Sequence, residues 1–471
     1  MERSAAVRSS MRRFLTTLQL GMAASLSAQR TALLDKLKAT PAGASIANEF
    51  ALRAQGKGSP HRASLKRVFD DEKATRVTFY RDSAAWCPYC QKLWMLLEEK
   101  QINYDVQLIN MRSYGEKPES FTRKVPRGIL PALELDGTMM TESLDIMALL
   151  DDTFPEIPTL PPRDSDAFQR ARSLLQLERK LFSTWCDYVF RGGWGSKRKF
   201  EGCLDEVDAA LAKTKGPWFL ESAGPGIVDL QYVSHVERMA GSVAYWKGDT
   251  LRGGRWKNLD AWFEAFEARP SYSASRSDWY THANDIPPQY GNGVDDGSNE
   301  QRAIRLALDG GDAAWRLPLP PLSSSDAPSD TLQPGWQAFE QDAPYEAAYH
   351  VLENLEAVSK FAARGAGKGG GWSFGRPDRA RLADPYARPA EGVVLEKVSE
   401  ALIAVGAILT SGCDTAAVDV SALKALDATT RQEVRASLKY VRDRVGVPRD
   451  MSYPAARCLR GSLSWLRDEL E

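Results

Sequence analysis

The segment Trp86-Cys-Pro-Tyr-Cys90 lies between two stretches of opposite character. Residues 76–80 (Arg-Val-Thr-Phe-Tyr) are rich in β-branched and aromatic side chains, which predicts a strand. Residues 92–100 carry leucines at helical spacing, which predicts a helix. The cysteine pair therefore stands in the loop between a strand and a helix. Pro88 falls in the first helical turn, where a missing N–H costs nothing, and the preceding cysteine faces the free amides of the helix start.

This position predicts a reactive thiol at Cys87. The positive end of a helix dipole favours thiolate over thiol, so the pKa of such a cysteine falls below its free value of about 8.5. Cys90 follows three residues later on the same helix face, within reach to attack a mixed disulfide at Cys87. The remaining cysteines are scattered along the chain and do not make a disulfide framework: Cys186, Cys203, Cys413 and Cys458.

Two other interpretations of the Cys87–Cys90 pair stay open. A zinc half-site uses the same spacing, but the sequence has no second CxxC, no CxxH and no HxxxH, and its four histidines stand far apart. The pair is alternatively two unreactive thiols at the start of a helix. We expect thiol chemistry and no metal.

The rest of the chain predicts an α/β domain followed by helical domains. Residues 104–109 and 131–135 have the composition of further strands, and a helix is expected to start near Ser143 and end by residue 154. Beyond residue 162, apolar residues recur at helical spacing, interrupted by a Pro- and Ser-rich stretch at 317–334. We predict an N-terminal extension at 1–75, a thioredoxin-like α/β domain at 76–158, an all-helical domain at 159–285, a linker at 286–334 and a mostly helical extension at 335–471.

Charge and hydropathy exclude several partner classes. Lys and Arg total 61 against 62 Asp and Glu, so the chain has no overall field that would attract nucleic acid or an anionic membrane. No uncharged apolar run reaches the roughly 18 residues that span a bilayer. The N-terminus is rich in Arg and Ser and has no acidic residue between Glu2 and Asp35, which suits an organelle transit peptide. The alternative is a plain N-terminal extension of a cytoplasmic protein.

Residues 79–154 resemble the N-terminal domain of cysteine-type glutathione transferases and are similar in pattern to the omega class. The shared features occur in the family's order: the Cys-Pro-Tyr-Cys, Lys117-Pro118, Gly128-Ile-Leu-Pro131 before a strand, and Glu142-Ser143 opening a helix. The helical part resembles the same family to about residue 280, although Gly226 stands where the family has a Ser or Thr cap before a structural Asp, here Asp229. A CPYC together with a long C-terminal extension is similar to the iota class of photosynthetic organisms, which implies a plastid location.

The resemblance implies roles for five residues in binding glutathione as a co-substrate. Pro131 is expected to follow a cis peptide bond, so that the backbone of Leu130 pairs with the cysteinyl part of glutathione. Glu142 and Ser143 are expected to hold the γ-glutamyl group, and Lys117 to lie near the glycyl carboxylate. Two of these residues have plainer interpretations, Lys117 as a solvated loop lysine and Ser143 as an ordinary helix cap.

These expectations favour a glutathione-dependent thiol transferase or reductase, either a homodimer or a monomer. Its substrates would be glutathionylated thiols or small oxidants, with dehydroascorbate and small disulfides as candidates. Conjugation to electrophiles should be weak, because a cysteine thiolate tends to form a disulfide with glutathione rather than deprotonate it. The alternative function is a non-catalytic ligand carrier or docking protein on the same scaffold. The sequence predicts no function for the 335–471 extension.

Overall fold

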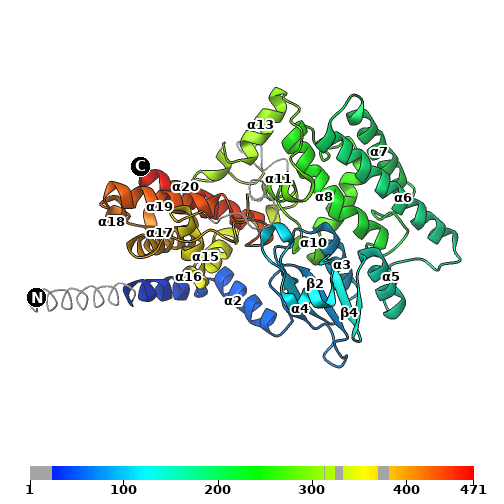
Figure 1. The fold of residues 1–471 in the computed structure, drawn as a ribbon, viewed down its shortest axis with the longest axis horizontal. Coiled ribbons are helices and arrows are strands. Elements are labelled where there is room, and N and C mark those ends of the chain that lie inside the picture. Colours follow the sequence, from blue (N-terminus) through cyan, green and yellow to red (C-terminus); the bar gives the residue numbers. More distant parts are fainter. Residues whose placement is uncertain (1–23, 312, 324–332, 370–380) are drawn as a thin grey trace, which may run out of the picture.

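The computed structural model describes residues 24–311, 313–323, 333–369 and 381–471 (Figure 1). An α/β domain and a helical domain lie together, and the C-terminal helices form a second lobe with the N-terminal helices (Figure 1). This arrangement confirms the predicted fold class. The Arg- and Ser-rich segment 1–23 lies outside the described residues, so the transit peptide stays a prediction.

Five strands form one sheet in the order β1-β3-β2-β4-β5. β2 and β3 are parallel and are connected by α3, whereas β4 runs antiparallel to β2 and pairs Ala132 with Tyr80. The start of β4 therefore lies beside the end of β2. The bounds are β1 (Lys66–Arg67), β2 (Val77–Asp82), α3 (Pro88–Glu99), β3 (Tyr104–Ile109), β4 (Ala132–Leu135) and β5 (Thr138–Met140).

The alternating side chains of β2 pack on both faces of the sheet. Phe79 is fully buried in the main core with the apolar residues of α3, and α5 (Ser143–Thr153) packs against α3. Tyr80 points the other way and packs against Phe121 of α4 (Glu119–Lys124), with ring centroids 5.6 Å apart. Period-two alternation thus covers the sheet with a helix on each side.

The domain begins before its predicted limit at residue 76. β1 pairs antiparallel with β3, and Arg67 of β1 makes a buried ion pair with Glu98 of α3, with Nε and Oε1 2.8 Å apart. A two-residue strand of Lys and Arg has no hydrophobic pattern by which it could be predicted.

The helical domain is built around α8 (Ile227–Lys247), which is buried along its whole length and contacts α3. Asp229 fixes its start: one carboxylate oxygen accepts from the Phe219 amide and the Trp262 indole, both at 3.0 Å, and the other from the Gly226 amide at 3.0 Å. Asp229 is therefore a structural residue. The other helices of this domain are α6 (Asp166–Cys186), α7 (Ser196–Leu211), α9 (Lys257–Glu267) and α10 (Pro270–Ser273).

The first part of the predicted 286–334 linker is helical in the structure. α13 (Asn299–Leu308) packs against α8 and buries Leu308, and Ser298 caps it by accepting from the Gln301 amide at 3.1 Å. The Pro- and Ser-rich composition at 317–334 was a poor guide to the residues before it. Two shorter helices precede α13, namely α11 (Trp279–Asp285) and α12 (Pro287–Tyr290).

The C-terminal extension has its own apolar core, to which the N-terminal helices contribute. Residues 24–38 are helical, and Leu34 and Leu37 are buried against the extension, while α2 (Pro41–Ala54) contacts α15. No helix of the described part of the chain is long and apolar enough to cross a membrane. The longer helices of the extension are α15 (Ala343–Glu353), α16 (Leu355–Ala362), α17 (Val393–Thr410), α19 (Ala428–Arg442) and α20 (Tyr453–Glu469).

The extension docks against the loop that precedes Cys87. The indole of Trp86 donates to the carbonyl of Val447 at 3.1 Å, and the guanidinium of Arg449 lies 4.8 Å from the Trp86 ring centroid. The Val447 amide in turn donates to Thr281 Oγ1 at 3.0 Å. The extension therefore forms part of the surroundings of the cysteine pair.

Candidate functional site

Cys87 occupies the position that the sequence predicts for it. It is the N-cap residue of α3, with extended backbone (φ −73°, ψ 118°), and Pro88 is the first helical residue. Its side chain makes no capping hydrogen bond, and 7 % of the residue is exposed, against 2 % for Cys90. The thiol of Cys87 thus stands at the open amides of a helix start, with Cys90 one turn further in.

A buried carboxylate completes this cluster. The Cys87 and Cys90 sulfurs and an Asp82 carboxylate oxygen all lie within 4.8 Å of one another. Asp82 is the last residue of β2 and is fully buried; its Oδ2 accepts from the Trp86 amide at 2.6 Å, and its Oδ1 has no hydrogen-bond partner. A carboxylate with one unpartnered oxygen beside two sulfurs is positioned to accept a proton.

Burial governs the protonation of both groups behind Cys87. It raises the pKa of the Asp82 carboxyl, an effect that Arg81 opposes. Burial also raises the pKa of the Cys90 thiol well above its ordinary value, and the hydrogen bond with Cys87 raises it further. Cys90 therefore holds its proton, and Asp82 is a stronger base than a solvated aspartate.

The same three atoms bear on the zinc interpretation. Two sulfurs and one carboxylate oxygen are acceptable zinc donors, but a structural zinc site is closed by four ligands. Within the described residues, no further His, Cys, Asp or Glu joins this group. The donor set favours thiol chemistry over a structural metal.

Arg238 of α8 holds the loop in front of the helix. Its guanidinium donates to the Trp86 carbonyl at 2.7 Å and to Gln91 Oε1 at 2.7 Å. Lys92 is also buried beside α8, donating to Gln231 Oε1 at 2.5 Å, and burial lowers its pKa to about 8. These cations come from two helices far apart in the sequence, so no local motif indicated them.

The residues expected to bind glutathione lie in three connecting segments, before α4, before β4 and at the start of α5. The Leu130–Pro131 peptide bond is cis and leads directly into β4. Lys117 packs against Gly128, and its ammonium lies in the field of both Cys87 and Cys90, although burial lowers its pKa overall. The structure thus brings Lys117 and the loop before β4 to the cysteines.

Glu142 and Ser143 stand together at the start of α5. Glu142 is its N-cap residue with a left-handed backbone (φ 69°), and Ser143 is the first helical residue. The plain cap interpretation of Ser143 is therefore wrong, because the cap position belongs to Glu142. The Glu142 carboxylate is exposed, and its nearest cation is Arg127, with Nη1 and Oε1 3.9 Å apart. Glu142 and the free amides of α5 thus offer a carboxylate and hydrogen-bond donors at one point.

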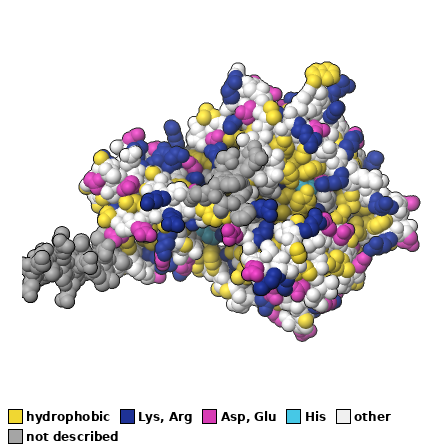
Figure 2. Space-filling view, in the orientation of Figure 1, with side chains coloured by type: hydrophobic (Ala, Val, Ile, Leu, Met, Phe, Trp, Pro, Cys, Tyr) yellow, Lys and Arg dark blue, Asp and Glu magenta, His cyan; other side chains and the backbone are white. Residues whose placement is uncertain are grey.

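Aromatic side chains form a wall next to Cys87. Half-buried Tyr89 lies 5.3 Å from the His235 ring, Phe182 lies 5.0 Å from the same ring, and Tyr290 lies 5.9 Å from Phe182. Burial raises the pKa of Tyr290, and Cys87 is among the groups whose charge adds to the rise. Hydrophobic side chains gather on the surface over α8, above the α/β domain (Figure 2). This wall suits the apolar part of a substrate, and the sequence did not identify it.

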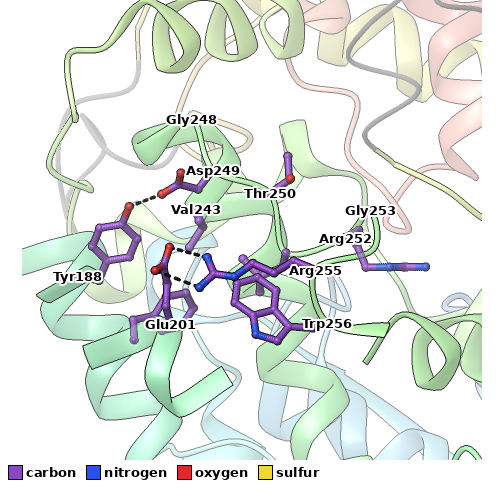
Figure 3. A pocket seen from close by; sticks show the side chains of 12 residues that line it. Tyr188, Glu201, Val243, Gly248, Asp249, Thr250, Arg252, Gly253, Arg255 and Trp256 are labelled. Atoms are coloured by element: carbon purple, nitrogen blue, oxygen red, sulfur yellow. Dashed lines mark hydrogen bonds and ion pairs between the residues drawn. The ribbon is translucent and has the colours of Figure 1, made fainter. Parts of the chain in front are cut away.

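A separate cavity lies among α7, α8 and the loop after α8 (Figure 3). Its volume is about 270 Å³. Its polar groups satisfy one another: Tyr188 donates to Asp249 at 2.5 Å, and Arg255 pairs with Glu201 at 2.8 Å. None of its lining residues belongs to the cysteine site, so it has no part in the chemistry considered below.

Comparison with known proteins places this geometry in a family. Residues 86–153 match the family model "Glutathione S-transferase, N-terminal domain". Glutathione S-transferase L3 of Arabidopsis thaliana is 30 % identical over 194 residues, 41 % of this chain and 79 % of the relative. Protein IN2-1 homolog A of Oryza sativa subsp. japonica is 26 % identical over 215 residues, 45 % of this chain and 83 % of the relative.

Among solved structures, glutathione transferase Omega 3C of Trametes versicolor matches 44 % of this chain and 91 % of its own, with 27 % identity and a TM-score of 0.37. The cysteine at the N-cap of α3, the cis proline before β4 and the Glu-Ser at the start of α5 lie within the residues 86–153 that match the family model. The chain belongs to the glutathione transferase family.

Proposed function

We propose that the protein is a glutathione-dependent thiol transferase in which Cys87 is the nucleophile. The observation that carries this proposal is the cluster of the Cys87 and Cys90 sulfurs with the Asp82 carboxylate, at the start of a helix in a glutathione transferase domain. A helix start favours thiolate at the first cysteine. A thiolate beside a second thiol is suited to disulfide exchange.

In the one-thiol route, the Cys87 thiolate attacks the glutathionyl sulfur of a mixed disulfide. A bond forms between Cys87 and that sulfur, and the substrate leaves as a thiolate. A second glutathione thiolate then attacks the same sulfur, which releases oxidised glutathione and restores Cys87. This route needs no other cysteine.

In the two-thiol route, Cys90 attacks the Cys87 sulfur and releases glutathione, leaving a Cys87–Cys90 disulfide. Cys90 must first lose its proton, which burial holds on the sulfur. Asp82 supplies the acceptor, since one of its carboxylate oxygens lies within 4.8 Å of both sulfurs and its Oδ1 has no hydrogen-bond partner. The protonated carboxyl then returns the proton to the departing glutathione thiolate. Two further glutathione molecules reduce the disulfide.

Glutathione would bind with its cysteinyl backbone on Leu130, before the cis Pro131, and its γ-glutamyl group at Glu142 and Ser143. Lys117 would meet the glycyl carboxylate. The aromatic wall of Tyr89, Phe182 and Tyr290 would receive the partner disulfide or oxidant. One relative, glutathione S-transferase DHAR3 of Arabidopsis thaliana, is 25 % identical over 34 % of this chain and 58 % of its own, and is described as chloroplastic. Dehydroascorbate, a candidate substrate from the sequence, is also to be tested. The plastid location, the iota class and the homodimer stay predictions.

The test is glutathione-dependent reduction of a glutathionylated peptide by the intact protein, Cys87→Ser and Cys90→Ser. Activity lost only in Cys87→Ser supports the one-thiol route, and loss in both supports the two-thiol route. If the reduced, intact protein has no activity on the peptide, on dehydroascorbate or on a small disulfide, the carrier function replaces this proposal.

A further inference from the structure

The extension contains a second pair of thiols that the sequence does not reveal. Cys413 follows α17 and Cys458 lies within α20; these two helices pack together, and the two thiols share a hydrogen bond. Both cysteines are free. These two cysteines are scattered in the sequence but not in space, because the fold brings them together across the 44 residues that separate them.

The turn after α17 fixes Cys413 against α20. The chain reverses at Gly412 and Cys413, both with left-handed backbone (φ 73° and 69°), and the Cys413 amide donates to the Ile408 carbonyl at 3.0 Å. A left-handed backbone is uncommon in a residue other than glycine. Cys413 is half-buried, whereas Cys458 is 7 % exposed and lies in the core of the extension. Cys413 is thus the more exposed residue of the pair, and Cys458 is covered.

The surroundings divide the pair into a nucleophile and a resolving thiol. Hydrogen bonds from Cys458 and then from Ser462 lower the pKa of Cys413, and the charge of Arg457 lowers it further, against the effect of burial. The hydrogen bond to Cys413, followed by burial, raises the pKa of Cys458 well above its ordinary value. Reactive cysteines have such an accessible, electropositive setting, whereas buried structural cysteines do not.

Cys186 is a useful contrast within the same chain. It is half-buried like Cys413, but it has no thiol partner, and burial raises its pKa to about 11. The pKa values of these two half-buried thiols therefore shift in opposite directions, and the difference arises from the hydrogen bonds and charge around Cys413.

We propose that Cys413 and Cys458 are a second redox-active site, which oxidised glutathione converts reversibly to a disulfide. The Cys413 thiolate attacks one sulfur of oxidised glutathione, forms a mixed disulfide and releases a glutathione thiolate. That thiolate takes the proton of Cys458, whose sulfur then attacks Cys413 and releases the second glutathione. One oxidised glutathione thus becomes two reduced molecules while two protein thiols become one disulfide. Because each step uses only these two cysteines and glutathione, this site does not depend on the function proposed for Cys87.

The experiment uses the full chain with Cys87→Ser and Cys90→Ser, so the first pair cannot contribute. The protein is equilibrated with reduced and oxidised glutathione at decreasing ratios, alkylated with iodoacetamide after denaturation, digested and analysed by mass spectrometry. We expect Cys413 and Cys458 to lose alkylation together, a disulfide-linked peptide to appear, and dithiothreitol to reverse both changes. Cys186 should stay alkylated throughout as the matched control.

Two further variants separate the steps. In Cys458→Ser, Cys413 should stop at a glutathione adduct, and in Cys413→Ser, Cys458 should take up no glutathione. The proposal is overturned if both thiols stay alkylated in oxidised glutathione alone, or if the protein with both tail cysteines gives only an adduct and no linked peptide. The presence or absence of the linked peptide in the protein that keeps Cys413 and Cys458 tests the proposal even if Cys413→Ser or Cys458→Ser folds poorly.

Discussion

The Cys87–Cys90 pair and the Cys413–Cys458 pair differ in what holds the proton on the second thiol. For Cys90, burial is the largest cause of the raised pKa, and the hydrogen bond with Cys87 comes second. For Cys458 the order is reversed, with the hydrogen bond to Cys413 first and burial second. The two pairs therefore respond differently when the first sulfur is consumed in a mixed disulfide.

When the first cysteine of a pair enters a mixed disulfide, its sulfur no longer accepts a hydrogen bond as a thiolate. The burial of the second thiol does not change. Cys458 then loses the main reason for its raised pKa, whereas Cys90 keeps the larger one. A pair of the first kind needs a base, and Asp82 stands beside it with an unpaired oxygen. In the Cys413–Cys458 pair, the glutathione thiolate released in the first step can accept the proton of Cys458. We therefore expect the resolving step of the Cys87–Cys90 pair, but not that of the Cys413–Cys458 pair, to depend on a neighbouring carboxylate.

The largest expected effect separates the roles of the two nucleophiles. Cys87→Ser should lower glutathione-dependent reductase activity by roughly 10³-fold or more, since no other group at the N-cap of α3 can form the mixed disulfide. The matched change Cys413→Ser should leave this activity unchanged, because Cys413 lies in the extension. Steady-state assays with a glutathionylated peptide measure both. A comparable loss in Cys413→Ser would show that the two pairs form one electron-transfer path instead of two sites.

Asp82→Asn should slow the resolving attack of Cys90 by roughly 10²-fold, because an amide cannot take the proton. In the unsubstituted protein, this step should accelerate as pH rises through the elevated pKa of Asp82 and then level off. The variant should lose that dependence. Rapid mixing of a Cys87–glutathione mixed disulfide, followed by release of glutathione across pH 5 to 9, measures the step. Resolution of the Cys413–Cys458 pair should be unaffected, and a parallel slowing there would refute the distinction.

Asp82→Asn should raise the stability of the protein although it slows the reaction. The pKa of Asp82 is raised in the folded state, so its carboxyl favours folding below the unfolded value of about 3.9 and loses that contribution as pH rises through the folded value. Asn stays neutral throughout and can still accept from the Trp86 amide. The variant should therefore be more stable at neutral pH, by on the order of 1 kcal/mol, in chemical denaturation. Lower stability at neutral pH would mean that ionised Asp82 is well accommodated.

Local chemistry made the first pair predictable, whereas the second pair depends on tertiary structure. A strand, a Cys-Pro-Tyr-Cys and a helix pattern within 25 residues place Cys87 at an N-cap, because proline and helix periodicity act over one or two turns. Asp82 is only five residues earlier, yet nothing in a strand sequence tells which buried carboxylate stays unpaired. Cys413 and Cys458 meet through the packing of α17 on α20. No spacing rule covers such a contact.

Parts of the fold also depend on long-range contacts that the local sequence does not predict. The α/β domain and the helical domains follow from periodicity, but β1, with its Lys and Arg, and α13, next to a Pro- and Ser-rich stretch, lack the expected composition. Arg238 reaches the Trp86 carbonyl from α8, and Val447 reaches the Trp86 indole from the extension. Each is a long-range contact made by a residue that is ordinary in its local sequence.

A smaller effect should come from Ser462→Ala in α20. Ser462 is the second of the hydrogen-bonding groups that lower the pKa of Cys413, so its loss should raise that pKa and reduce the thiolate fraction. Alkylation of Cys413 by iodoacetamide at pH 7 should slow a few-fold, while alkylation of Cys87 in the same sample stays unchanged. Equal rates at Cys413 before and after the substitution would mean that Cys458 and Arg457 suffice to set its reactivity.

The smallest expected effect tests whether the two regions are coupled through their shared contact. Trp86→Phe removes the hydrogen bond from the indole to the Val447 carbonyl, 3.1 Å long, but that carbonyl still accepts from Ser277 Oγ. Because no buried carbonyl is left without a donor, the cost should be only about 1–2 kcal/mol, from the lost bond and the space beside Gly446.

Reductase activity of Trp86→Phe should stay within a few-fold, since Arg238 still holds the carbonyl of residue 86 and Pro88 still starts α3. The glutathione ratio at which Cys413 and Cys458 become oxidised should not move. Denaturant titration, the peptide assay and the alkylation map measure the three quantities on one sample. A shift of the oxidation midpoint of the Cys413–Cys458 pair with this substitution would contradict this expectation. It would mean that the contact at Val447 couples the two thiol pairs.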